Sequence, residues 1–361
     1  MTLKGEITIC SLLISLFIIT GCIRNKDVLI PQFLYEIPCQ KTDSIGVWQN
    51  LGLAGQTITA IATHPKKPHV IFAGSSMDFS AGIMGKLFYS RDCGKTWVTL
   101  LEGGSYTDIK FDPLNPDIIY AAPHSLIKST DGGMNWFDIS NGIKIDRETQ
   151  IATIVIDPKN RNILFVGTGG FFGGRLYKST NGGKSWQNLA GDTLIDGVIS
   201  LAINPENTGI IYAGTSWSGS VYKSVDGGEI WNKTGLADTG YLIHDIEIYP
   251  KNPHRIIVGW RGISQSFDAG DTWGPFNEGL PDSAQGMKLC IDPVSLDYYC
   301  VVNKGDSGGI YRREENDSQW QKFGIEGLQM GSYYTDLKTT SDGTTLYFGP
   351  QEGGLYKIRL R

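Results

Sequence analysis

The sequence is poor in the residue types that most often carry catalytic or nucleic-acid-binding chemistry. It has only five histidines and six cysteines in 361 residues, and the histidines do not show the spacing of a metal site. No serine or cysteine lies in a recognisable nucleophile motif. The net charge is −5, without a stripe of basic residues, which argues against nucleic acid as a partner. We therefore predict no metal and no cofactor.

Long apolar runs are also lacking, except near the N-terminus. Residues 7–19 are mostly apolar and follow Lys4, which is typical of a signal peptide and too short for a comfortable membrane span. The run ends in Ile19-Thr20-Gly21-Cys22, which resembles a bacterial lipobox. This resemblance implies cleavage before Cys22 and lipidation of its thiol; an ordinary cleaved signal is the alternative. We expect a lipoprotein signal peptide over 1–21, a tether over 22–45, and a protein that is exported to the cell envelope and lipid-anchored to a membrane.

Glycine, in contrast, is abundant at 46 residues, and part of it marks a repeated turn. A serine is followed by Asp or Asn two residues later, Gly two further on, and Trp three after that. Five copies occur: Ser90/Asp92/Gly94/Trp97, Ser129/Asp131/Gly133/Trp136, Ser179/Asn181/Gly183/Trp186, Ser224/Asp226/Gly228/Trp231 and Ser266/Asp268/Gly270/Trp273. A sixth has decayed to Arg313/Glu315/Asp317/Trp320, and Trp48 stands alone. These tryptophans recur every 39 to 50 residues, a period suited to a solenoid or a propeller blade.

The residue types of this unit have physical reasons. Asp or Asn can accept a hydrogen bond from a backbone N–H two residues on, Gly accepts a positive φ, and Trp can be buried between neighbouring sheets. The pattern resembles the Asp box of the BNR-repeat propellers. Sialidases carry the same box, which offers a catalytic reading, but a turn repeated in every blade is a structural device. We interpret these five positions as structural: Asp92, Asp131, Asn181, Asp226 and Asp268.

Short apolar strands surround each copy of the turn. Six cycles of four strands can be counted, and a seventh over 335–358 stops after its third strand. The orphan strand Val47–Leu51 supplies the missing fourth strand, so that neither end leaves an unpaired sheet edge. We predict an all-β, seven-bladed β-propeller over 46–361, closed by an N-terminal strand. A linear stack of hairpins is the alternative.

In this topology the loops between second and third strands, and the connections between blades, lie on one face around the central channel. Such variable loops are where propellers usually carry their sites. Candidate contacts on the loops are Phe79, Phe171, Phe172, Trp217, Trp260 and Arg261. Candidates at the channel mouth are Asp108, Asp245, Lys288 and Asp336, with Tyr106 and Tyr334 before two of the aspartates. The loop aromatics could instead fold back over the blades. The channel residues could hold a cation or a basic side chain, or bond to the next blade's backbone.

Four cysteines remain after removal of the signal and lipidation. In the sixth cycle, Cys290 and Cys300 lie at positions that we expect to face each other across a hairpin, within disulfide range. Cys39 and Cys93 would then pair with each other. Four free buried thiols are the alternative.

The whole-chain pattern is similar to that of the photosystem II assembly/stability factor family, and more distantly to sialidase and xyloglucanase propellers. The first resemblance implies a non-catalytic scaffold for the assembly of a membrane protein complex. That family is associated with an arginine patch, whereas the arginines here are scattered, so the architecture and a general binding role carry over. Two functions follow: a monomeric envelope protein that binds or assembles proteins, or a glycan-binding or glycan-cleaving propeller.

Overall fold

The computed structural model describes residues 43–78, 80–146, 149–169, 174–189, 196–282, 284, 288–303, 308–324, 336–351 and 353–361. Residues 1–42 lie outside this range, so the predicted signal peptide, Cys22 and Cys39 are not among the described residues. No helix in the described part of the chain is long and apolar enough to cross a membrane.

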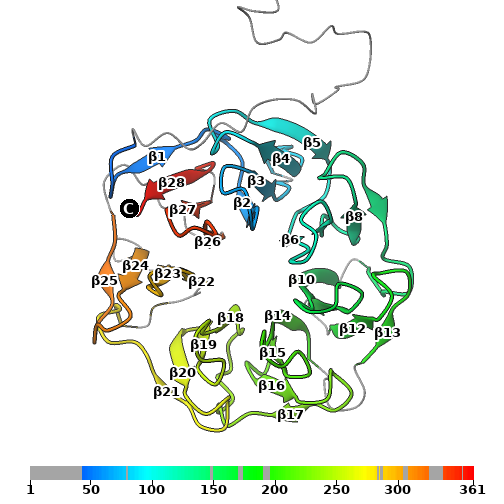
Figure 1. Ribbon diagram of the computed structural model, residues 1–361, viewed down its shortest axis with the longest axis vertical. Coiled ribbons are helices and arrows are strands. Elements are labelled where there is room, and N and C mark those ends of the chain that lie inside the picture. The colour runs from blue at the N-terminus through cyan, green and yellow to red at the C-terminus, as the bar shows by residue number, and fades with distance from the viewer. Residues whose placement is uncertain are drawn as a thin grey trace, which may run out of the picture. The chain divides into compact units, whose positions relative to one another are not determined.

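Seven antiparallel sheets of four strands form a ring (Figure 1). In chain order and from the channel outward, the strands of the first three blades are β2 (Ile58–Thr63), β3 (Ile71–Ser75), β4 (Lys86–Ser90), β5 (Val98–Glu102); β6 (Ile109–Phe111), β7 (Ile119–Ala121), β8 (Ile127–Ser129), β9 (Phe137–Asp138); β10 (Gln150–Ile156), β11 (Leu164–Gly169), β12 (Arg175–Ser179), β13 (Gln187–Asn188). Those of the next three are β14 (Val198–Ile203), β15 (Ile211–Thr215), β16 (Val221–Ser224), β17 (Asn232–Lys233); β18 (Asp245–Ile248), β19 (Ile256–Trp260), β20 (Gly262–Ser266), β21 (Gly274–Pro275); β22 (Leu289–Ile291), β23 (Tyr298–Val302), β24 (Gly309–Arg313), β25 (Gln321–Lys322). The seventh blade contains β26 (Leu337–Thr339), β27 (Thr345–Phe348), β28 (Tyr356–Arg359) and β1 (Trp48–Asn50). The predicted all-β, seven-bladed propeller is confirmed.

The N-terminal strand closes the ring. β1 pairs antiparallel with β28, and Trp48 lies opposite Ile358. The Trp48 side chain is buried and packs edge-on against Phe348 in β27, while its indole N–H donates to the Gly324 carbonyl of the sixth blade at 3.0 Å. The predicted pairing of the two ends is confirmed.

The hydrophobic core consists of seven clusters, one at each interface between neighbouring blades. Alternate residues of one strand enter different clusters, as the two-residue period of a strand requires. In β3, for example, Phe72 packs towards the second blade, whereas Ile71 and Ala73 pack towards the seventh. Because both faces of each sheet are buried, a blade is stabilised only together with its two neighbours.

The repeated turns form hydrogen-bonded loops, shown here for the second blade. The Ser129 hydroxyl donates to Asp131 at 2.8 Å and accepts from the Gly133 backbone N–H at 2.8 Å. Asp131 accepts from the backbone N–H of Asn135, four residues on, not two residues on as the sequence suggested. Gly133 has a φ of 94°, a conformation that glycine adopts without steric cost.

The other four turns share the serine-to-aspartate or serine-to-asparagine bond and the glycine-to-serine bond. The serine, not the acid, is the buried polar residue: Ser129 and Ser224 are fully buried, while Asp131 and Asp226 are exposed. Each turn also donates a backbone N–H to the loop between the first two strands of its blade. These turns and loops therefore share one face, as predicted.

The expected Cys290–Cys300 disulfide is wrong: both thiols are free. Cys290 in β22 lies opposite Tyr299, and Cys300 in β23 lies opposite Leu289. Residues opposite each other point to the same side, so the two cysteines point to opposite sides of the hairpin. Cys300 is buried between the fifth and sixth blades and Cys290 between the sixth and seventh.

A shorter turn causes this shift in register. In the fourth blade, the Asn204 N–H donates to the carbonyl of Ile210, six residues on. In the sixth blade, the Asp292 N–H donates to the carbonyl of Asp297, only five residues on. Since a slip of one residue moves a side chain to the other face, the offset that pairs positions in the other blades does not pair the cysteines.

Cys93 takes part in a disulfide. It is buried and has a φ of 65° within the first repeated turn. The remaining cysteines, Cys10, Cys22 and Cys39, lie outside the described residues, so the pairing with Cys39 stays a prediction.

Candidate functional site

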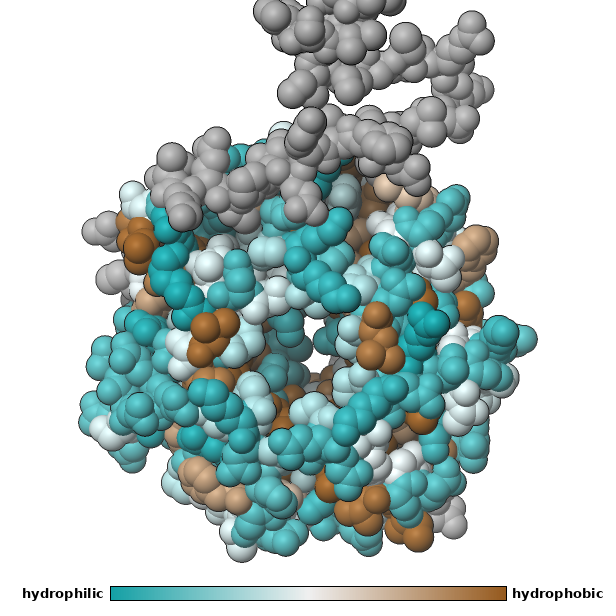
Figure 2. Space-filling view, viewed as in Figure 1, coloured by the Kyte–Doolittle hydropathy of each residue, from teal (hydrophilic) through white to brown (hydrophobic). Residues whose placement is uncertain are grey.

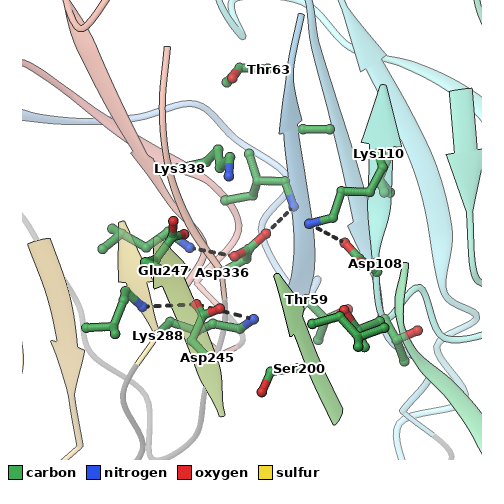
Figure 3. Close-up of a pocket in the computed structure, with 18 of the residues that line it drawn as sticks. Thr59, Thr63, Asp108, Lys110, Ser200, Asp245, Glu247, Lys288, Asp336 and Lys338 are labelled. Atoms are coloured by element: carbon green, nitrogen blue, oxygen red, sulfur yellow. Dashed lines mark hydrogen bonds and ion pairs between the residues drawn. The ribbon is translucent and has the colours of Figure 1, made fainter. Parts of the chain in front are cut away.

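A cavity of about 260 Å³ occupies the central channel. The four predicted channel residues Asp108, Asp245, Lys288 and Asp336 all line it, and they project from the innermost strands or the residues just before them (Figure 3). The space-filling view shows an opening through the middle of the ring, bordered by both hydrophilic and apolar surface (Figure 2). The structure thus brings together residues that are up to 228 positions apart in the sequence.

The three aspartates hold neighbouring blades together. Asp108 accepts a hydrogen bond from the Ile154 backbone N–H at 2.9 Å, and Asp336 accepts from that of Ile61 at 2.7 Å. Asp245 accepts from the backbone N–H of Leu289 at 3.1 Å. In each case the donor belongs to the innermost strand of the next blade. The structural alternative to ligand binding, a bond to the next blade's backbone, is therefore present at all three.

Hydroxyl side chains make equivalent links between other blades. Thr59 donates to the Tyr106 carbonyl at 2.6 Å, and Ser200 donates to the Ile243 carbonyl at 2.7 Å. Because these donors and acceptors are satisfied within the protein, they contribute to the ring rather than to a reaction.

Two lysines partly neutralise the aspartates. The Lys110 ammonium lies 3.2 Å from Asp108, and that of Lys288 lies 3.7 Å from Asp245. Burial alone would lower the pKa of Lys288, but the nearby carboxylates of Asp245 and Asp336 outweigh it and raise that pKa. Lys288 is therefore a permanent positive charge of the channel.

A second layer of charge was missed in the sequence. Glu247 and Lys338 also line the cavity: Glu247 is two residues after Asp245 in β18, and Lys338, in β26, is two residues after Asp336, which directly precedes that strand. Side chains at i and i+2 of a strand share a face, so this spacing could have revealed them. Burial in the channel wall raises the pKa of Glu247 to about 7, against the opposing effect of the Lys338 ammonium.

Tyr106 does not reach the channel. It is buried, with 1% of its side chain exposed, between the first and second blades, and burial raises its pKa to about 12. A Cβ at Gly74 would lie 2.4 Å from the Tyr106 Cβ, so this glycine leaves the space that the tyrosine fills. The prediction of Tyr106 as a binding residue is wrong, and Tyr334 lies outside the described residues.

Exposed aromatic residues gather on the loops of the fourth and fifth blades. We call Trp217, Tyr241, Trp260 and Arg261 the loop patch. Trp217 is 58% exposed and Tyr241 is 42% exposed. The rings of Tyr241 and Trp260 lie 6.3 Å apart, and the Arg261 guanidinium lies 5.0 Å from the Tyr241 ring centre and donates to its hydroxyl.

Hydrogen bonds fix the backbone of this patch. Asp196 accepts from the backbone N–H groups of Trp217 at 3.2 Å and Ser218 at 2.6 Å. Thr239, in the connection between the fourth and fifth blades, donates to the Gly219 carbonyl at 3.1 Å. The loop and the connection therefore share one face, as predicted, and present the aromatics from an ordered base.

The sequence allowed the loop aromatics either to be exposed for contacts or to fold back over the blades, and one residue is found in each arrangement. Trp217 is exposed, whereas Trp260 is partly buried and donates its indole N–H to the Ser264 hydroxyl at 3.1 Å. Tyr241 was not predicted because its connection has no periodic pattern. Phe79, Phe171 and Phe172 lie outside the described residues. Among those that are described, no group of three or more His, Cys, Asp or Glu residues is arranged to hold a metal ion.

Comparison with known proteins agrees with the fold. Residues 98–357 match the model of a family described as "Photosynthesis system II assembly factor YCF48". The solved structure of YCF48 from Cyanidioschyzon merolae superposes with a TM-score of 0.64 at 17% identity, over 87% of this chain and 98% of that one. A structure described as "YCF48 bound to D1 peptide" superposes with a TM-score of 0.62 at 16% identity, over 90% of this chain and 97% of that one.

A second similarity is to a larger enzyme. A xyloglucanase from Hypocrea jecorina (strain QM6a) is 28% identical over 162 residues, which is 43% of this chain. The match spans only 18% of that enzyme's length.

Proposed function

We propose that this chain, which belongs to the photosynthesis system II assembly factor YCF48 family, is a non-catalytic lipoprotein of the cell envelope that binds a protein partner. In this proposal the propeller is a scaffold for the assembly of a membrane protein complex. Family membership rests on the match over residues 98–357.

The loop patch is the observation that carries the proposal. Exposed aromatics and arginine are the side chains that dominate protein interfaces, and here they are supported by an ordered hydrogen-bonded base. A related propeller of the same fold is described as bound to a D1 peptide, which supports the idea that such propellers accept a segment of another protein.

The channel supports a non-catalytic function. Glycosidases need two carboxyl groups that are free to act on opposite sides of a bond. Three of the four channel carboxylates accept backbone hydrogen bonds from the next blade. Their geometry suits a structural role in the ring.

Crosslinking and pull-down from the native envelope test the proposal. We expect the wild-type chain to capture a defined membrane protein complex, and Trp217→Ala and Arg261→Ala to reduce this capture. Phe137→Ala is the matched control, because Phe137 is an equally exposed aromatic, at 59%, on the outer strand of the second blade. Capture that is unchanged in both loop-patch variants, or equally reduced in the control, would contradict the proposal.

The lipid anchor is tested separately. The lipobox-like Ile19-Thr20-Gly21-Cys22 supports it, and labelled palmitate should be incorporated into the wild-type chain and not into Cys22→Ser. Incorporation that survives this substitution would exclude Cys22 as the modified residue.

A glycan-binding or glycan-cleaving function is the second candidate. The sequence similarity to a xyloglucanase and the exposed aromatic rings of the loop patch favour it, since aromatic faces also bind sugars. Binding or release of xyloglucan oligosaccharides by the purified chain, lost in Trp217→Ala, would replace the scaffold proposal.

A further inference from the structure

Two charged side chains of the channel have no direct partner. Among the described residues, neither the Glu247 carboxylate nor the Lys338 ammonium makes a side-chain hydrogen bond or an ion pair. Both line the cavity and point into it (Figure 3). Both residues are half-buried, so their charged groups are accessible from the cavity.

The three aspartates of the channel already have hydrogen-bond or ion-pair partners within the protein. Asp108 has Lys110 and the Ile154 N–H, and Asp245 has Lys288 and the Leu289 N–H. Asp336 accepts from two backbone N–H groups, those of Ile61 and Leu337. Glu247 and Lys338 are therefore the charged side chains of the channel that remain available to a ligand.

These two residues lie on either side of the sixth blade. Glu247 is in β18 of the fifth blade and Lys338 is in β26 of the seventh. The intervening strand β22 presents Cys290, which has its polar contacts with Thr339. Lys338 is the charge that most strongly stabilises ionised Glu247, yet the two side chains form no ion pair and line the same cavity, so each is available to one end of a ligand that carries both charges.

The charge balance selects the kind of ligand. The cavity is lined by four carboxyl groups, Asp108, Asp245, Glu247 and Asp336, and three ammonium groups, Lys110, Lys288 and Lys338. A simple cation would be repelled by the three ammonium groups, and a simple anion would be repelled by the carboxylates. A molecule that carries one positive and one negative charge can place each charge beside a group of opposite sign.

We propose that the channel binds a small zwitterion of the α-amino-acid class, whose ammonium group contacts Glu247 and whose carboxylate contacts Lys338. The volume of about 260 Å³ is below the usual range of drug-sized pockets, which suits one amino acid and excludes a folded peptide segment. This site is separate from the loop patch and does not depend on the proposed scaffold function.

Calorimetric titration of the purified chain tests the site. The probes are glycine and L-alanine, with acetate and methylammonium chloride as matched ligands that carry only one of the two charges. We expect saturable binding of the amino acids and at least about tenfold weaker binding of either single-charge probe, because each of these probes loses one of the two charged contacts.

Isosteric variants then assign the residues. Glu247→Gln and Lys338→Met should each weaken amino-acid binding about tenfold or more. Glu102→Gln and Lys144→Met remove the same charges from exposed surface positions and should leave the affinity unchanged.

Three results would overturn the proposal: no saturable binding of either amino acid, equal binding of acetate or methylammonium, or unchanged affinity in both channel variants. Should a variant fail to fold, the wild-type chain still decides the matter through the probe comparison. Glycine affinity should also rise with pH across neutrality as Glu247 ionises, and an affinity that falls or stays constant over that range contradicts its role.

Discussion

Asp336 in the seventh blade accepts a hydrogen bond from the backbone N–H of Ile61 in the first blade, with an N–O distance of 2.7 Å. This bond spans the junction where the two ends of the chain meet. Asp108 and Asp245 make the same contact to the blade that follows each of them. The propeller is therefore fastened at its inner rim by side chains as well as by the hydrophobic clusters between blades.

Asp336→Ala should lower the free energy of unfolding by about 1–3 kcal/mol, because it leaves the buried N–H of Ile61 without an acceptor. Asp336→Asn keeps an acceptor oxygen and should cost less. Urea unfolding of the two variants checks this order, and equal losses would mean that the hydrogen bond to Ile61 is not what stabilises the junction.

The blade count and the ring closure could be predicted from the sequence because both rest on features that repeat. The tryptophan turns define the period, and the incomplete last cycle matches the orphan strand at Trp48. The register of the sixth blade could not be predicted in the same way. Its turn is one residue shorter, and the apolar residues Tyr298 and Tyr299 satisfy the strand pattern in either register.

Repetition also decided which residues of the candidate site could be predicted: the aspartates were predicted, whereas Glu247 and Lys338 were not. Asp108, Asp245 and Asp336 occupy equivalent positions in their blades, so the repeat exposed them. Glu247 and Lys338 occupy one equivalent position but carry opposite charges, and only their spacing of two residues from a predicted aspartate marks them in the sequence. Only the closed ring brings the fifth and seventh blades to one cavity, so their pairing is a consequence of tertiary structure.

Ser129→Ala should destabilise the protein by about 1–3 kcal/mol, because the buried N–H of Gly133 loses its acceptor. Asp131→Ala should cost less, since the Asp131 carboxylate is exposed and water can replace it. Thermal unfolding at pH 7 measures both. A larger loss in Asp131→Ala would show that the acid, not the serine, holds the turn.

The same turns predict sensitivity to strong acid. Hydrogen bonds from the Thr272 side chain and backbone lower the pKa of Asp268 to about 2. Since the pKa is lowered in the folded state, the stability that the ionised Asp268 carboxylate contributes is present above about pH 4 and lost as the pH falls towards 2. Asp268→Asn should flatten the stability profile over this range, and a profile parallel to the wild type would contradict the assignment.

Removal of residues 46–52 should expose the edge of β28 and promote aggregation. Trp48→Ala is the milder variant, and it should cost about 3–5 kcal/mol because a large buried aromatic is lost. Light scattering and melting temperature distinguish the two effects. A monomeric, fully stable truncated chain would show that β1 is not needed for closure.

Cys290 and Cys300 should both react with an alkylating reagent once the protein is unfolded without reductant, whereas Cys93 should react only after reduction. In the folded protein the first two should be protected by burial. Mass spectrometry of the digested protein reads out all three. A crosslinked peptide that contains Cys290 and Cys300 would refute the register of the sixth blade.

Glu247 should make the folded protein less stable as the pH rises through neutrality. Burial raises its pKa from 4.5 to about 7, while Lys338, Asp245, Lys110 and Lys288 act on it from the surrounding strands. Between these two pH values the folded chain binds more protons than the unfolded chain, so the free energy of unfolding contributed by this group falls with increasing pH.

Glu247→Gln removes the ionisation and should therefore have a higher melting temperature than the wild type at pH 8 but not at pH 5. Glu102→Gln, on the exposed surface of the first blade, controls for a general effect of charge. If the wild type and Glu247→Gln differ by the same amount at both pH values, Glu247 does not ionise near neutrality in the folded chain.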